Sequence, residues 1–159
     1  MKSLLIIGAG GYGRLVKELA ELLGYEKIDF LDDNSPLAVG KVQELEILQN
    51  EYDGTIVAIG NPAIREKLFR KVKRPVSIIH PSAVISPSAQ IGEGCVIEAG
   101  TVINTAATVQ NSCFICAGAV VNHNAEVEEF CQIDCNAVVG SGMIVPSGTK
   151  VESCTVYTI

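Results

Sequence analysis

Tryptophan is absent from this chain, and aromatic residues of all kinds make up only 5% of its 159 residues. A hydrophobic interior must therefore be filled by aliphatic residues, alanine and cysteine, which suits a narrow core. Apolar residues nevertheless reach 48% and charged residues 19%, a composition typical of a folded protein rather than a disordered one. The length is sufficient for one ordinary domain or for two small ones that share an interface.

An excess of positive charge is also missing. The chain has 12 Lys and Arg against 18 Asp and Glu, for a formal net charge of −6. This balance argues against nucleic acid or an anionic membrane surface as the main partner. The apolar run at residues 4–7 is too short for a signal peptide or a membrane span, and no other run approaches the necessary length. We therefore expect a cytoplasmic protein without a membrane partner.

Six cysteines are present, but no secretion signal supports a disulfide framework. The spacing of Cys113 with Cys116, and of Cys131 with Cys135, raises the alternative of a zinc site. The second pair lacks the usual two-residue spacing, and the repeat described below accounts for three of the cysteines as packing residues. We therefore expect reduced thiols and no bound metal.

The N-terminal half of the chain alternates short apolar runs with helical segments. Strands are predicted at residues 2–7, 27–31 and 55–59, helices at 14–23 and 63–71, a short helix or loop at 42–49, and a linker at 71–75. The first helix is predicted to pack through the stripe Leu15, Leu19, Leu22 and Leu23. This order predicts a small parallel α/β subdomain of Rossmann-like type over residues 1–75.

A glycine motif follows the first predicted strand. Gly8, Gly10 and Gly13 have the G-x-G-x-x-G spacing of a dinucleotide fingerprint, whose backbone N–H groups and helix dipole can hold a phosphate. Asp32 lies where such a fingerprint has a ribose-binding acid. The subdomain, however, has room for only one mononucleotide-binding half. A dinucleotide site and a tight turn with nothing bound are the alternatives.

From residue 79 onward the pattern changes to a period of six. A β-branched aliphatic residue occupies every sixth position: Ile79, Ile85, Ile91, Ile97, Ile103, Val109, Ile115, Val121, Val127, Ile133, Val139, Val145 and Val151. Four residues after each of them a small residue follows: Ala83, Ala89, Cys95, Thr101, Ala107, Cys113, Ala119, Ala125, Cys131 and Ala137, with Met143 as a break before Thr149. Hexapeptide periodicity of this kind marks a parallel β-helix.

Each hexad makes one short strand and a turn, and three hexads make one triangular coil. The aliphatic and small residues point inward, and equivalent residues of successive coils stack on each other. Cys95, Cys113 and Cys131 therefore form an interior ladder. We predict a β-helix domain over residues 76–159, with regular repeats at 79–151. The period alone does not determine its hand.

The chain has two histidines. His80, beside Pro81, is expected to serve a turn at the domain junction. His123 falls at an outward position next to a corner, between Asn122 and Asn124. An imidazole there can accept a proton from an amine or hydroxyl group that attacks a thioester, provided that a backbone donor stabilises the oxyanion. That donor is expected near Ser141, one coil further on; a surface histidine without a role is the alternative.

Both halves together resemble the bacterial sugar acetyltransferases of the sialic acid O-acetyltransferase and UDP-N-acetylbacillosamine-type acetyltransferase family. The resemblance rests on five motifs, in order and spacing over nearly the whole length: residues 8–13 (GAGGYG), 30–33 (FLDD), 57–61 (VAIGN), 79–83 (IHPSA) and 121–123 (VNH). It implies a left-handed β-helix, a homotrimer, and acetyl-CoA as co-substrate for acetylation of a sugar amine or hydroxyl between adjacent β-helices.

The resemblance also implies residue roles. His123 aligns with the catalytic base, followed by Asn124, and Gln132 and Ser141 are expected to contact CoA. The nucleotide of a UDP-linked sugar is expected at the loops that contain Gly8, Gly10, Gly11, Gly13, Asp32, Asp33, Gly60 and Asn61.

Three features depart from the family pattern. Asn124 stands where relatives have Asp or Glu, and Gln132 stands where they have a second histidine. Relatives also continue for about two further coils that help hold CoA. We therefore expect slower or altered transfer, with fewer contacts to the nucleotide end of CoA. A nucleotide-sugar-binding or scaffold homologue without a complete CoA site, and a trimeric structural module without a ligand, are the alternatives.

Overall fold

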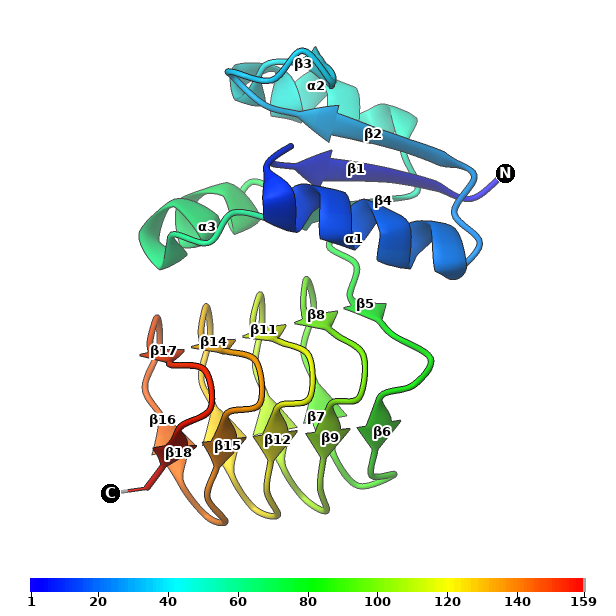
Figure 1. The fold of residues 1–159 in the computed structure, drawn as a ribbon. Helices are drawn as coiled ribbons and strands as arrows, with labels where there is room; N and C mark the ends of the chain where they lie inside the picture. The colour runs from blue at the N-terminus through cyan, green and yellow to red at the C-terminus, as the bar shows by residue number, and fades with distance from the viewer. Residues whose placement is uncertain (159) are drawn as a thin grey trace. The chain divides into compact units, whose positions relative to one another are not determined.

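A computed structural model describes residues 1–158 and divides the chain into two compact units, Met1–Ile78 and a second unit that begins at Ile79 (Figure 1). The first is an α/β layer structure, and the second is a stack of coils. No helix within residues 1–158 combines the length and apolar character that crossing a membrane requires.

The first unit is built on a four-stranded parallel sheet in the order β3-β2-β1-β4 (Figure 1). In chain order its elements are β1 (Ser3–Ile7), α1 (Gly11–Leu22), β2 (Lys27–Leu31), β3 (Ala38–Gly40), η1 (Val42–Glu44), α2 (Leu45–Leu48), η2 (Gln49–Glu51), β4 (Gly54–Val57) and α3 (Pro62–Phe69). β1 is buried along its whole length, as a central parallel strand covered on both faces must be. Leu5 and Ile7 face a cluster with residues of α2 and α3 such as Leu45 and Leu68.

Helix α1 packs through a different stripe from the predicted one. Leu15 and Leu22 are 37% and 59% exposed, whereas Val16 and Ala20 are buried completely. The reason is Gly13, where an added Cβ would lie 1.9 Å from the Gly8 carbonyl oxygen. This close approach determines which side of the helix meets the sheet, and Val16 and Ala20 follow on that side. Only Leu19, of the predicted stripe, is buried.

Two further segments differ from expectation. β3 was not predicted, because a three-residue edge strand that ends in glycine has no readable alternation. The predicted linker at 71–75 is tied to the sheet: the Thr55 N–H donates to the Arg74 carbonyl at 2.9 Å, and the Val76 N–H donates to the Thr55 carbonyl at 3.2 Å.

The second unit consists of two-residue strands joined by turns. They are β5 (Ile78–Ile79), β6 (Val84–Ile85), β7 (Gln90–Ile91), β8 (Val96–Ile97), β9 (Val102–Ile103), β10 (Thr108–Val109), β11 (Phe114–Ile115), β12 (Val120–Val121), β13 (Glu126–Val127), β14 (Gln132–Ile133), β15 (Val138–Val139), β16 (Ile144–Val145), β17 (Lys150–Val151) and β18 (Val156–Tyr157). Every third strand joins the same parallel sheet, in the orders β16-β13-β10-β7, β17-β14-β11-β8-β5 and β18-β15-β12-β9-β6 (Figure 1).

The registers confirm the predicted coil of three hexads, because Val102 pairs with Val120 and Val120 pairs with Val138. The aliphatic and small residues of the hexads form one continuous interior cluster. Tyr157 packs against this cluster in the place of the next aliphatic residue, so the repeat continues one hexad past Val151. That hexad was not predicted, because its inward residue is aromatic and the predicted pattern consisted of aliphatic residues.

The interior cysteine ladder is confirmed. The thiols of Cys95, Cys113 and Cys131 are fully buried, and each donates at 3.0 Å to a main-chain carbonyl oxygen of the following coil. Within residues 1–158, no group of three or more His, Cys, Asp or Glu side chains is arranged to hold a metal ion.

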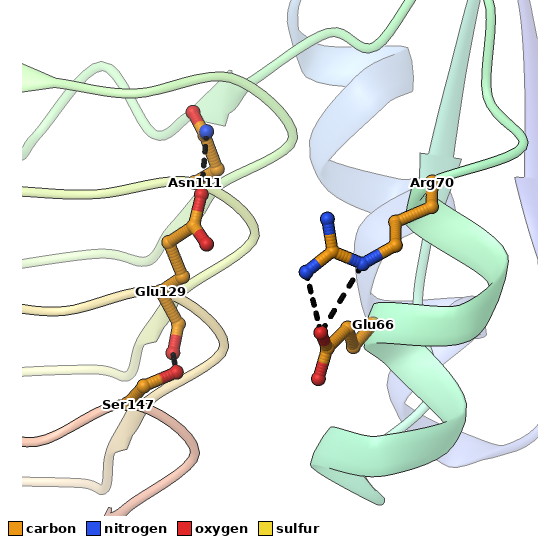
Figure 2. A network of polar contacts seen from close by, with 5 residues as sticks. All are labelled: Glu66, Arg70, Asn111, Glu129 and Ser147. Carbon is orange, nitrogen blue, oxygen red and sulfur yellow. Dashed lines mark hydrogen bonds and ion pairs between the residues drawn. The ribbon is translucent and has the colours of Figure 1, made fainter.

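Polar ladders also tie neighbouring coils together at a corner. The Asn111 Nδ2 donates to Glu129 Oε1 at 2.9 Å, and the Ser147 hydroxyl donates to the Glu129 carbonyl oxygen at 2.9 Å (Figure 2). In the first unit, the exposed Arg70 that follows α3 forms an ion pair with Glu66 at 2.6 Å (Figure 2). Exposed pairs of this kind contribute little to stability, whereas the ladder fixes the spacing of the coils.

Candidate functional site

The glycine loop of the first unit connects β1 to α1. Gly8 has φ of +106°, and its N–H donates to the Leu31 carbonyl at 2.8 Å. An added Cβ at Gly8 would lie 3.0 Å from the Ala58 carbonyl oxygen, which places the loop directly beside the segment after β4. Gly8 and Gly13 are thus glycines because the backbone needs a left-handed conformation at one position and close packing at the other.

Gly10, Gly11 and Gly60 are different, because an added Cβ at any of them would meet no atom of residues 1–158 within 4 Å apart from its own local backbone. Packing does not require glycine at these positions. Gly10 is the N-cap of α1 and provides no side-chain acceptor for the first-turn N–H groups. The loop therefore presents accessible backbone donors at the positive end of a helix dipole, the arrangement that binds phosphate.

Asp32 braces this loop. One carboxylate oxygen accepts from the Ala9 N–H at 2.8 Å, and the other accepts from the Asn34 N–H at 2.8 Å. These bonds, led by the one from Ala9, hold the pKa of Asp32 below its ordinary value. Asp33 similarly accepts from the Val42 N–H at 3.0 Å. Both aspartates lie at the end of β2 as predicted, and Asp32 ties the glycine loop to the segment after β2, with one oxygen bonded to each.

The second loop of the first unit connects β4 to α3. The Asn61 Oδ1 accepts from the Ile64 N–H at 3.1 Å and caps α3, while Pro62 occupies the first helical position. β1 and β4 are neighbours at the point where the strand order reverses. Ligands of open parallel sheets bind in the crevice at such a point, beyond the carboxyl ends of the strands. The structure thus places Gly8 of the glycine loop beside Ala58 and Ile59, the residues that directly precede Gly60 and Asn61.

Two of the cavities on the first unit are relevant to the site. One of about 350 Å³ is on the α3 side and is lined by Asp33, Val42, Gln43, Glu46, Ile59, Ile64, Lys67, Leu68 and Lys71. The other, of about 410 Å³, is lined by Arg14, Lys17, Glu18, Glu21, Ile28, Asp29, Phe30 and Leu37. Of these two, only the first is lined both by a residue that follows β2, Asp33, and by one that follows β4, Ile59.

His123 lies in the turn between β12 and β13 of the second unit and is exposed. Its Nδ1 lies 3.1 Å from the Asn124 Oδ1. When the Asn124 amide oxygen accepts in this contact, the neutral imidazole carries its proton on Nδ1. The Nε2 atom then carries a lone pair and can accept a proton from a substrate.

The backbone around His123 is held from both neighbouring coils. The His123 carbonyl accepts from the Gly142 N–H at 3.0 Å, and the Asn124 N–H donates to the Thr105 carbonyl at 3.0 Å. Asn124 itself has φ of +60°, a conformation that asparagine tolerates better than most residues. The corner is therefore a rigid support for the imidazole.

Ser141 is exposed one coil beyond His123, as predicted. The Gly142 N–H is committed to the His123 carbonyl. The Ser141 N–H has no hydrogen-bond partner among residues 1–158, so it is the backbone donor that this corner can offer to an oxyanion.

Gln132 does not share this corner. It lies on β14, in the sheet β17-β14-β11-β8-β5, which forms the face opposite the His123 corner within a coil. Its amide nitrogen is 4.0 Å from the Cys116 sulfur. Within one copy of the chain, the structure therefore does not bring Gln132 together with His123.

A row of valines on the outside of the second unit was missed by the sequence analysis. It lies on the sheet that contains β12 and consists of Val84, Val102, Val120, Val138 and Val156. We call it the valine row. Val84 and Val156 are each 64% exposed. The signal was available, because these valines recur once in every coil, but the predicted repeat was defined by its inward positions alone.

The coil of stacked hexads, with a small parallel α/β unit before it, is typical of a hexapeptide-repeat transferase. Residues 3–72 match the PglD N-terminal domain, and residues 75–105 match the bacterial transferase hexapeptide (six repeats). The chain belongs to the UDP-N-acetylbacillosamine-type family of bacterial sugar acetyltransferases, whose β-helix is left-handed, and the predicted fold class and family are confirmed.

Individual relatives support this assignment. The acetyltransferase domain of PglB from Neisseria gonorrhoeae, solved in complex with acetyl coenzyme A, is 33% identical with a TM-score of 0.73, over 98% of this chain and 92% of that chain. PerB from Caulobacter crescentus, solved with CoA and GDP-perosamine, is 26% identical with a TM-score of 0.60, over 100% of this chain and 93% of that one. UDP-N-acetylbacillosamine N-acetyltransferase from Bacillus subtilis is 31% identical over 62% of this chain; the match spans about half (52%) of that relative.

Proposed function

We propose that the protein transfers an acetyl group from acetyl-CoA to an amino or hydroxyl group of a nucleotide-linked sugar. The proposal rests on the position of the His123 imidazole, which is exposed. Its Nδ1 contacts Asn124, and its Nε2 is available for proton transfer. The relatives add the substrate class, because PglB is solved with acetyl coenzyme A and PerB with CoA and GDP-perosamine.

The reaction needs one base and one oxyanion donor. The substrate nitrogen or oxygen attacks the thioester carbonyl carbon and forms a C–N or C–O bond while His123 Nε2 accepts its proton. The carbonyl oxygen gains negative charge, which the Ser141 N–H stabilises. The C–S bond then breaks, and the CoA thiolate leaves and takes up a proton. No metal or covalent enzyme intermediate is required.

Asn124 stands where relatives have an Asp or Glu after the histidine. Its carbonyl oxygen orients the imidazole, but it carries no charge to stabilise the imidazolium that forms when Nε2 accepts the proton. We therefore propose a transfer step slower than that of an enzyme with Asp or Glu after the histidine.

The nucleotide is proposed to bind to the first unit. The diphosphate lies against the exposed N–H groups of the glycine loop and of the loop at Gly60 and Asn61, with Asp32 as the brace. The cavity of about 350 Å³ beside Asp33 and Ile59 accommodates the base and ribose. We favour UDP as the carrier because of the relative that acts on UDP-N-acetylbacillosamine, and GDP is the alternative.

A homotrimer is proposed as the functional form. Five stacked valines on one outer face are an unusual surface for a single copy, and burying them against a second copy of the chain removes apolar area from water. His123 follows β12 at the edge of that face. Gln132, on the opposite face, is then proposed to reach CoA bound at the His123 corner of an adjacent copy.

The test is a transfer assay. Purified protein is mixed with acetyl-CoA and, separately, with UDP- and GDP-linked amino sugars, and free CoA thiol and acetylated product are measured by mass spectrometry. Acetylation of one of these sugars supports the proposal, and lability of the product to hydroxylamine distinguishes an ester from an amide. If the protein binds a nucleotide sugar but not acetyl-CoA, the result contradicts the enzyme and favours a nucleotide-sugar-binding protein.

A further inference from the structure

Arg65 is the largest fully buried side chain of residues 1–158, and it is 0% exposed. It lies in the first turn of α3, where its N–H donates to the Asn61 carbonyl at 2.9 Å. Burial of a guanidinium group is costly, and an apolar residue of similar volume would fill the same space without that cost. The contacts of the guanidinium should therefore explain what the charge does.

The guanidinium binds the loop after β4. Its Nη1 donates to the Ile59 carbonyl oxygen at 2.9 Å and to the Gly60 carbonyl oxygen at 2.9 Å. These two peptide groups belong to the loop whose exposed backbone at Gly60 and Asn61 is proposed to bind the nucleotide. Arg65 thus contacts that loop from its buried side.

The orientation of the carbonyls determines the orientation of the amides. In a trans peptide, the C=O of one residue and the N–H of the next point in opposite directions, and the chain has no cis peptide bonds among residues 1–158. Because the Ile59 and Gly60 carbonyls point at the buried guanidinium, the N–H groups of Gly60 and Asn61 point away from it. Both residues are exposed, and neither N–H has a hydrogen-bond partner among residues 1–158.

We infer that Arg65 is a positioning residue for the diphosphate of the nucleotide. It holds two peptide groups so that their N–H groups face the ligand, and its fixed positive charge lies behind them. This role rests on the proposed nucleotide site. The ligand class that it favours is a nucleoside diphosphate over the corresponding nucleoside, since the oriented donors and the charge act on phosphate oxygens.

The test compares Arg65→Met, which removes the charge but keeps a long side chain, and Arg65→Lys, which keeps the charge, with the wild type. Calorimetric titration with UDP, GDP, uridine and guanosine measures the affinity of each. Arg65→Met is expected to lose about tenfold or more in diphosphate affinity and less than about twofold in nucleoside affinity, because the loss of a charged hydrogen-bond donor acts at the phosphates. Arg65→Lys is expected to recover part of the diphosphate affinity.

Turnover gives a second readout: KM for the nucleotide sugar should rise while kcat changes little. If Arg65→Met does not fold, the same comparison is made with Arg65→Lys alone, whose diphosphate affinity should fall below that of the wild type. Equal losses for diphosphate and nucleoside, or unchanged diphosphate affinity in a folded variant, would contradict the positioning role. A wild type that binds neither diphosphate overturns the nucleotide site and this role together.

Discussion

The two units of this chain prepare their sites in opposite ways. In the first unit, the candidate site consists mainly of main-chain groups, shaped by glycines and braced by Asp32. In the second, a regular repeat presents one side chain, His123, at a turn whose backbone is fixed by the coils on either side. Binding of an anion needs many oriented donors, whereas proton transfer needs a single atom in place.

This difference predicts where each unit is sensitive to substitution. The first unit should lose ligand affinity through changes that alter backbone shape. The second should tolerate outward changes and fail at inward ones, because every inward residue stacks on its equivalents in the neighbouring coils.

The largest effect is expected inside the coil. Val139→Asp places an unpaired carboxylate in a fully buried stack and should cost more than about 4 kcal/mol, enough to prevent folding of the second unit. Its neighbour Val138 lies in the valine row, so the Val138→Asp protein should fold but fail to trimerise. Circular dichroism and sedimentation measure the two outcomes. A folded Val139→Asp protein, or a trimeric Val138→Asp protein, would contradict the assigned faces.

The next effect concerns catalysis alone. His123→Ala should lower kcat by about 10² to 10⁴-fold. The free energy of unfolding should stay within about 0.5 kcal/mol of the wild-type value, since the side chain is exposed. His80→Ala is the matched control. His80 lies in the turn after β5, where its Nδ1 accepts from the Ser82 N–H at 3.0 Å, and its removal should leave kcat near the wild-type value. Wild-type turnover in His123→Ala would remove the proposed base.

A smaller effect is expected at the brace of the glycine loop. Asp32→Asn replaces the carboxylate whose two oxygens accept hydrogen bonds from backbone N–H groups. The free energy of unfolding should fall by about 1.5 to 3 kcal/mol, with a lower Tm, and UDP should bind more weakly. The lowered pKa of Asp32 means that this stabilisation is fully present above the ordinary value near 3.8 and is lost as pH falls through the lower folded value.

Chemical denaturation across pH provides the control. The difference in unfolding free energy between wild type and Asp32→Asn should be constant from pH 5 to 8 and should shrink only below pH about 4. A difference that disappears near neutral pH would show that the carboxylate does not act as described.

The smallest effect is one of thiol reactivity. Of the six cysteines, only Cys135 and Cys154 are exposed, so a thiol reagent should modify two groups in the native protein and six after denaturation. Partial burial, with nearby Glu98 and Asp134, raises the pKa of Cys135, so it should react more slowly than Cys154. Rapid native modification of the interior cysteines would contradict the sealed coil.

The repeat explains why the second unit could be predicted so fully from the sequence. Each hexad forms its own strand and turn, and its contacts to the next coil always lie three hexads away, so periodicity alone specifies which residues point inward. The same frame placed His123 outside and the cysteine ladder inside. It also contained the valine row, because equivalent outward positions of every third hexad lie on the same face of the coil. Tyr157 was not predicted as an inward residue, because it is aromatic and the repeat was defined by aliphatic residues.

The first unit could be predicted only in outline. Strand β1, the glycine motif and the cap at Asn61 have local signals, but the packed face of α1 is determined by the close approach of Gly13 to Gly8. The roles of Asp32 and Arg65 also depend on contacts between segments far apart in the sequence or on burial, which no local pattern records. Gln132 was assigned to CoA by resemblance, and only the topology placed it on the face opposite His123.

The claim that the nucleotide binds the first unit and acetyl-CoA the second can be tested by hydrogen exchange of the whole protein with one ligand at a time. UDP alone should slow exchange at residues 8–13, 32–34 and 59–61, and acetyl-CoA alone should slow exchange only in peptides after residue 79, around His123 and Ser141. Protection of the glycine loop by acetyl-CoA, or no protection of the first unit by either UDP or GDP, would contradict the account.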